Sequence, residues 1–194
     1  WVARYVARVN PNGRNVDYMV LSHWHSDHGG TPFWCTAEVS RKIHWWSVPY
    51  KRSGFGIALE DLKFARSIDR GYPDYDDPIP QDTPDHTGRH WRDILAYLRK
   101  RDGLVCERRR LGATDQIVPL RGEVKGFSVF NLCANGKIAF PDGRVVDCYA
   151  DRLAANPRPT YLNENGMSLG MIFTYGKFRF YTAGDFSDRW KRAD

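Results

Sequence analysis

The pattern of apolar and polar positions predicts regular structure at the start of the chain. Residues 1–9 carry apolar side chains at helical spacing, which predicts a helix, with a strand cut off at its start as the alternative. A turn is expected over 10–13, where Pro11 and Gly13 interrupt the pattern. The apolar stretch 16–21 is rich in strand-forming residues and predicts a buried strand.

The middle of the chain is less regular. Residues 31–90 are aromatic without clear periodicity, although a short helix is expected over 61–67 and a loop rich in Pro and Asp over 71–87. The strongest helix prediction is 90–101, because its apolar positions form one stripe. Basic residues in its last turn suit the helix dipole, and Asp102-Gly103 should end it.

The second half reads as strands and turns. Strands are expected over 116–120, 127–132, 137–140 and 145–149, with hairpin turns at Asn135-Gly136 and Asp142-Gly143. Residues 171–185 are expected to form two more strands around the turn Tyr175-Gly176-Lys177, the second ending in Gly184-Asp185. The order of helices and strands therefore predicts the α/β class.

Composition fits one globular domain and no membrane span. The chain has 194 residues, 42% of them hydrophobic, and no apolar run approaches the roughly 20 residues that cross a bilayer. Its four cysteines are scattered without metal-binding spacing and are interpreted as reduced thiols. The net charge of +6 would attract a polyanion such as nucleic acid, although basic clusters at a helix end and in a loop are more often solvated surface.

Potential metal ligands are concentrated in one segment, directly after the first predicted strand. Three of the six histidines and one carboxylate fall within six positions, in the pattern His23-x-His25-x-Asp27-His28. Imidazole nitrogen and carboxylate oxygen are ligands of zinc and its first-row neighbours. In an extended segment, alternate side chains share a side, so His23, His25 and Asp27 are expected to face one pocket. Two adjacent metals would then be held by His23 with His25 and by Asp27 with His28.

A strand followed by Ser-His-Trp-His-Ser-Asp-His-Gly-Gly resembles the metallo-β-lactamase fold superfamily of binuclear metal hydrolases. The far end agrees, since a strand ends in Gly184-Asp185, and the resemblance implies that Asp185 bridges the two metals. The segment Asn163 to Leu169 is similar to the Asn/Ser segment of the branch related to the competence protein ComEC, which is associated with DNA processing at the membrane. Amide and hydroxyl groups are weak metal ligands, so Asn163, Asn165 and Ser168 are expected to orient substrate or a metal-bound water.

The resemblance implies an αββα sandwich, incomplete at both ends. Residues 1–194 would form a single partial domain with an irregular, aromatic-rich insertion around 31–115. Other superfamily members carry further histidines, whereas this chain has none after His90, so we interpret it as a fragment of a longer protein that could also contain a membrane domain. His86 and His90 are four apart and either complete the metal site or mark a polar helix entry. His44 is interpreted as a packing or surface residue.

The predicted activity is that of a metal-dependent hydrolase. Two divalent ions, zinc or manganese, would lower the pKa of a shared water, and the resulting metal-bound hydroxide would attack the substrate. Asp27 and Asp185 would hold the metals and manage the proton. A phosphodiester is the first expectation for the substrate, and an ester, lactone or thioester is the second, because the resembled superfamily hosts all of these. A degenerate domain that binds a metal or a partner without turnover stays open, as do the compartment and the oligomeric state.

Overall fold

The computed structural model describes residues 2–30, 54–80, 86–157 and 162–186. The chain forms two compact units, the first made of Trp1–Ile68 and Asp82–Glu107, and the second of Asp69–Gln81 and Arg108–Asp194. Parallel and antiparallel strands occur together with helices, so the predicted α/β class is confirmed. The expectation of a single partial domain over 1–194 stays a prediction.

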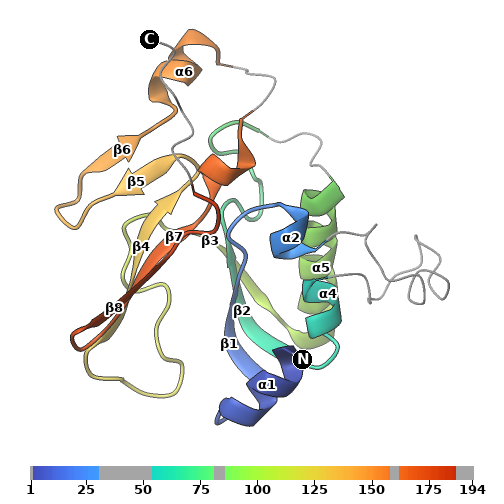
Figure 1. Ribbon diagram of the computed structural model, residues 1–194. Helices are drawn as coiled ribbons and strands as arrows, with labels where there is room; N and C mark the ends of the chain where they lie inside the picture. Colours follow the sequence, from blue (N-terminus) through green and yellow to red (C-terminus); the bar gives the residue numbers. More distant parts are fainter. Residues whose placement is uncertain (1, 31–53, 81–85, 158–161, 187–194) are drawn as a thin grey trace. The chain divides into compact units, whose positions relative to one another are not determined.

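The first unit is a small sheet with helices (Figure 1). Helix α1 (Val2–Val9) leads through a turn into strand β1 (Asn15–Val20), which pairs in parallel with β2 (Lys63–Asp69). Strand β3 (Val105–Arg108) completes the order β1-β2-β3. The helices are α2 (Ser26–Gly29), α4 (Phe55–Ala58) and α5 (His86–Asp102). The helix expected at the start, the strand after it and the turn between them are confirmed.

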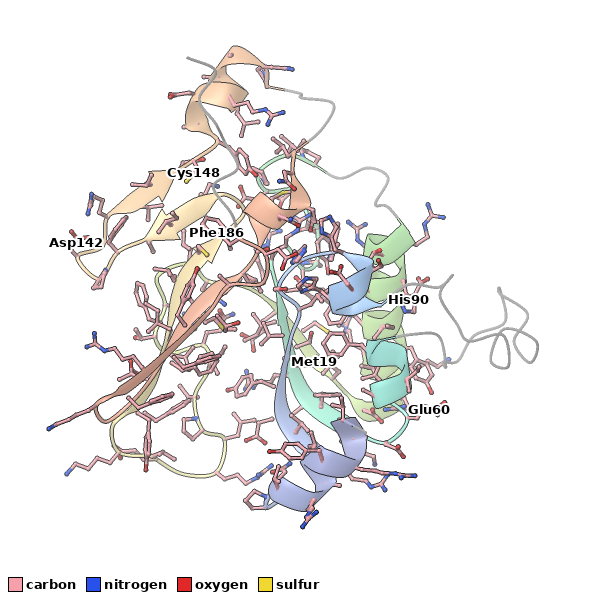
Figure 2. The ribbon with its side chains drawn as sticks, viewed as in Figure 1. Met19, Glu60, His90, Asp142, Cys148 and Phe186 are labelled. Carbon is pink, nitrogen blue, oxygen red and sulfur yellow. The ribbon has the colours of Figure 1, made fainter. Side chains whose placement is uncertain are left out.

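The core of this unit lies between the sheet and α5. The strand residues Met19 and Ile68 are almost fully buried, and so is the whole predicted stripe of the helix: Trp91, Ile94, Leu95 and Leu98. Figure 2 labels Met19 on β1 and His90 on α5. Each large apolar side chain buried here contributes about 1.5–3 kcal/mol. The helix ends where Asp102-Gly103 predicted, with Gly103 at a φ of +74°.

The second unit contains an antiparallel sheet with the strand order β6-β5-β4-β7-β8. Its strands are β4 (Phe127–Ala134), β5 (Lys137–Ala139), β6 (Val145–Asp147), β7 (Gly170–Tyr175) and β8 (Phe178–Thr182). Helix α6 (Ala150–Ala155) and the 3-10 helix η1 (Glu164–Met167) lie between β6 and β7 in the chain. The hairpin turn at Asn135-Gly136 is confirmed, since both residues have positive φ, at 55° and 74°.

Two local predictions were wrong. Residues 61–67 were expected to be helical, but most of them belong to β2, whose pairing with β1 outweighs local propensity. No strand forms over 116–120, where the Gln116 side chain instead accepts from the Arg110 amide and donates to the Arg108 carbonyl. The stretch around 31–115, where an irregular insertion is expected, contains α4, β2, α5 and β3 within its described part, and α5 covers the helix predicted over 90–101.

Helix α5 begins at His86, four residues before the predicted start. The Pro84-Asp85 dipeptide in the sequence is a helix-start signal that explains the earlier boundary. His86 and His90 therefore belong to one helix, and His90 is buried at 4% exposure. His44 lies outside the described residues.

Candidate metal centre

The histidine segment begins where β1 leaves the parallel sheet. The amide of Leu21 still donates to the Ile68 carbonyl, at 3.3 Å, and the backbone then turns away from β2. Leu21 is buried at 2% exposure, which anchors the base of the segment in the core. The side chains that follow are thus presented at the carboxyl end of a parallel strand, where α/β proteins commonly place functional groups.

Three imidazoles converge in this segment, with His23 between the other two. The ring centroid of His23 lies 4.7 Å from that of His25 and 4.2 Å from that of His28. Nε2 of His23 is 3.1 Å from Nδ1 of His25, within hydrogen-bonding distance. His23 is 1% exposed, whereas His25 and His28 are half-buried, so the cluster is open to ligands on one side.

The other ring nitrogen of His23 has a local partner. Its Nδ1 lies 3.2 Å from Oγ of Ser22, a hydroxyl that either donates or accepts depending on the tautomer. Nε2 of His23 is therefore the nitrogen that points toward the other histidines of the cluster. A contact on the second nitrogen helps to orient the ring of a metal-binding histidine.

Asp27 lies in a helical turn rather than in an extended segment. The prediction that it shares one side of an extended segment with His23 and His25 is therefore wrong. Helix α2 begins at Ser26, and the amides of His28 and Gly29 both donate to the His25 carbonyl. The turn brings a carboxylate oxygen of Asp27 to 3.6 Å from Nε2 of His28. The Asp27 side chain is 75% exposed, so it faces solvent while remaining beside the histidines.

Glycines allow a close backbone approach beside the histidine segment. Gly30 has a φ of +85°, and Gly54, at the start of α4, has a φ of +60°. A Cβ atom on Gly54 would lie 2.7 Å from Cα of Gly30 and 2.8 Å from the Gly29 carbonyl oxygen. Helix α2 also contacts α5. The histidine segment is therefore supported by two other elements of the same unit.

The remaining predicted site residues belong to the second unit. Asp185 is exposed and lies three residues beyond the end of β8. Asn163 caps η1, since its Oδ1 accepts a hydrogen bond from the Asn165 amide at 3.1 Å. Two buried oxygens of this segment, Oδ1 of Asn165 and Oγ of Ser168, have no hydrogen-bond partner within the described residues.

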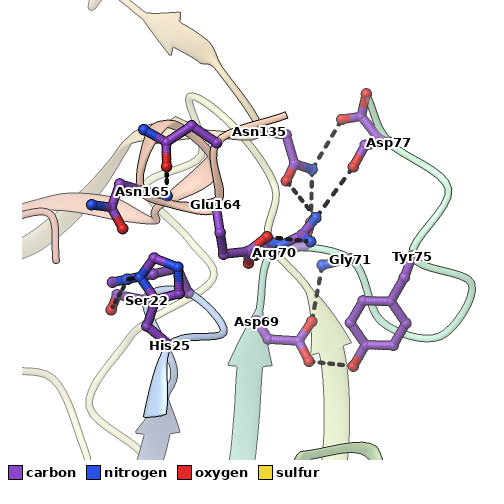
Figure 3. Close-up of polar contacts among 12 residues, drawn as sticks. Ser22, His25, Asp69, Arg70, Gly71, Tyr75, Asp77, Asn135, Glu164 and Asn165 are labelled. Atoms are coloured by element: carbon purple, nitrogen blue, oxygen red, sulfur yellow. Dashed lines mark hydrogen bonds and ion pairs between the residues drawn. The ribbon is translucent and has the colours of Figure 1, made fainter. Parts of the chain in front are cut away.

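Sequence reasoning missed a buried arginine that contacts this segment. Arg70 is 1% exposed and forms a two-pronged ion pair with Glu164, at 2.9 and 3.0 Å (Figure 3). No sequence signal joins these residues, which lie 94 positions apart. The neighbouring carboxylate of Asp69 is also buried and accepts from the Tyr75 hydroxyl and from the amides of Gly71 and Tyr72.

Burial also shifts two pKa values in the second unit. Desolvation lowers the pKa of Arg109 to about 10, and this guanidinium donates to the Gly170 carbonyl. Desolvation raises the pKa of the Cys133 thiol to about 11, although the nearby Arg109 charge opposes that shift. Cys133 is therefore a protonated core thiol at neutral pH. Among the described cysteines, Cys133 and Cys148 form no disulfide, and Cys35 lies outside the described residues.

The donor set of the first unit fits a divalent metal ion. Three imidazoles within a few ångströms of one another, beside a carboxylate, supply the ligand types that zinc and manganese accept. No family model matches the chain, and no curated protein matches it significantly. Among the described residues, no helix is both long enough and apolar enough to span a bilayer.

Proposed function

We propose that this protein is a metal-dependent hydrolase whose divalent ion is held by His23, His25, Asp27 and His28. The observation that carries the proposal is the convergence of three imidazoles directly after a buried parallel strand. A surface loop that was merely rich in histidine would not place its central ring at 1% exposure. Zinc is the first expectation for the metal, and manganese is the second.

The metallo-β-lactamase resemblance extends this proposal in two ways. It adds Asp185 as a ligand shared by two ions, and it implies an αββα sandwich as the architecture. The presence of both parallel and antiparallel strands supports the sandwich, because that architecture combines such strands with helices. Both extensions draw on the sequence motifs, namely the histidine segment and the Gly184-Asp185 strand end.

The residues of the chain have distinct roles in this proposal. His23 is the inner ligand, and the Ser22 hydroxyl orients its ring. Asp27, exposed and adjacent to His28, is placed to accept a proton from water at the open side of the cluster. A bound divalent ion would supply a water of lowered pKa and positive charge that stabilises the anionic transition state. Asn163, Asn165 and Ser168 are proposed to orient the substrate.

A phosphodiester is the favoured substrate class. The Asn163-to-Leu169 segment resembles the ComEC-related branch, and the net charge of +6 favours a polyanion over a neutral ester. Nucleic acid is one such substrate, and its binding should then weaken steeply with added salt. A carboxylic ester, lactone or thioester is the alternative, and a metal-binding domain without turnover is the alternative to an enzyme.

The test is a substrate panel offered to chain that has been stripped with EDTA and reloaded with zinc or manganese. The panel contains bis-p-nitrophenyl phosphate, single-stranded DNA, a lactone and a thioester. The proposal predicts turnover of a phosphodiester only after metal is restored. Turnover of the lactone or thioester alone would overturn the substrate class. Bound metal without turnover of any substrate would overturn the hydrolase and favour the non-catalytic domain.

A further inference from the structure

The buried guanidinium of Arg70 connects three segments of the second unit. Its Nε and Nη2 donate to the two carboxylate oxygens of Glu164, at 2.9 and 3.0 Å. Its Nη1 donates to Oδ1 of Asn135 and lies 3.5 Å from the Asp77 carbonyl oxygen (Figure 3). Arg70 thus contacts η1, the β4–β5 turn and the loop that follows β2.

Asn135 completes this network from the other side. Its Nδ2 donates to the Arg70 carbonyl at 2.9 Å and to a carboxylate oxygen of Asp77 at 3.1 Å. Its backbone amide donates to the Met167 carbonyl at 3.1 Å, inside η1. Lys137 pairs with the second oxygen of Asp77 at 2.6 Å. Charges and hydrogen bonds are therefore matched throughout the network, which rigidifies it.

The network contacts a segment in which two buried side-chain oxygens have no hydrogen-bond partner among the described residues. Ser168 is fully buried, and its Oγ has no partner within the described part of the chain, nor has Oδ1 of Asn165. A buried polar atom without a partner costs about 1–3 kcal/mol. Buried polar atoms without partners are often found at functional sites, where a ligand can bind to them. The amides around them are bonded locally: that of Asn165 donates to Oδ1 of Asn163, and that of Ser168 donates to the Asn165 carbonyl.

We propose that Arg70 is a positioning residue that, through Glu164, holds Asn165 and Ser168 in place for the substrate. This proposal rests on the proposed hydrolase function and deepens it. The two-pronged pairing requires the planar guanidinium, since a lysine ammonium can only make a point contact with the carboxylate. Lysine at position 70 would keep the positive charge, but it would no longer hold the Glu164 carboxylate in one orientation.

The matched pair of variants is Arg70→Lys and Arg108→Lys. Arg108 contacts the same loop after β2, donating to the carbonyls of Gly71 and Tyr72 and pairing with Asp76, but none of its observed contacts is with η1. Hydrogen exchange of individual amides is the first measurement. Arg70→Lys should speed exchange at Asn165 and Ser168 about tenfold and leave Asn131 of β4 unchanged, whereas Arg108→Lys should change Asn165 and Ser168 by less than about twofold.

Kinetics with bis-p-nitrophenyl phosphate are the second measurement. Arg70→Lys should lower kcat/KM about 10–100-fold at unchanged metal content, the range seen when supporting hydrogen bonds are lost. In an Asn165→Ala/Ser168→Ala background, Arg70→Lys should lower kcat/KM by less than about twofold, because the side chains that Arg70 positions are absent. A purely structural role would lower activity equally in both backgrounds.

The two measurements separate the two proposals. Unchanged exchange at Asn165 and Ser168 in Arg70→Lys would overturn the positioning role, whatever the activity. An equal loss of kcat/KM in both backgrounds would also overturn it. Faster exchange at those amides, together with a metal-loaded wild-type chain that hydrolyses no substrate, would overturn the hydrolase while leaving the hold of Arg70 on η1 established.

Discussion

The histidine segment of the first unit and the Asn163–Ser168 segment of the second differ in how far along the chain their contacting residues lie. The ring nitrogens of His23 contact Ser22 and His25, which lie one and two positions away in the chain. The second segment is instead held by residues far along the chain, Arg70 and Asn135. Both segments carry polar side chains to which the sequence analysis assigns roles in metal-dependent hydrolysis.

This difference indicates two sources of order. Ligands that lie close in sequence are brought together by local backbone geometry, and a bound ion would complete their arrangement, because metal binding and local folding are coupled. Uncharged groups that orient a substrate gain nothing from an ion, so the protein must preorganise them with buried contacts. The predictions below either break this contrast or sharpen it.

The largest effect is expected from removing the proposed ligands. Asp27→Ala and His28→Ala should each reduce hydrolysis at least about 1,000-fold, the scale seen when one member of a catalytic unit is lost. Steady-state rates with the metal-loaded chain are the measurement. His44→Ala, a histidine outside the segment, should retain nearly full activity. Equal inactivation of the His44 variant would show that the site is misassigned.

The buried ion pair of the second unit should dominate its stability. Arg70→Met should lower the free energy of unfolding by about 3–5 kcal/mol, because it removes the buried guanidinium that pairs with the Glu164 carboxylate. Denaturant titration measures this loss. The control is Arg144→Met, which removes an exposed pair with Asp142 and should cost less than about 1 kcal/mol. Similar losses in the two variants would contradict the contrast between the segments.

Gly54 tests the support behind the histidines. Gly54→Ala should cost about 1–3 kcal/mol, since its Cβ would press on the Gly30 backbone and the positive φ adds strain. The change should also weaken zinc binding while leaving amide exchange at Asn165 unchanged. Gly13→Ala is the control, because Gly13 has a similar φ of +61° but open space around its Cβ position. Calorimetric zinc titration of both variants distinguishes crowding from strain.

The smallest change is expected for Ser168→Ala. Its buried hydroxyl has no partner in the described residues, so its removal should leave stability unchanged or raise it by up to about 1 kcal/mol. Hydrolysis should nevertheless fall if Ser168 orients the substrate, a trade-off typical of functional positions. A marked loss of stability without loss of activity would assign Ser168 to packing alone.

The contrast also explains what the sequence could predict. Helix α5 and the β7–β8 hairpin follow from local periodicity and turn residues, and the ligand motif follows from spacing within six positions. Residues 61–67 were mispredicted because their strand is set by pairing with β1, some 48 positions earlier in the chain: Lys63 is opposite Asn15. The Arg70–Glu164 pair has no local signature at all, since only the tertiary fold brings the two residues together.

Zinc binding by the histidine segment tests the central claim most directly. Equilibrium dialysis of the EDTA-stripped chain against zinc, followed by elemental analysis, gives the number of ions bound per chain. We expect at least one ion in the wild-type chain and in His44→Ala, and a loss of that ion in His23→Ala, because His23 lies at the centre of the three rings. A wild-type chain that binds no metal yet folds and hydrolyses a substrate would contradict the account, as would undiminished zinc binding in His23→Ala.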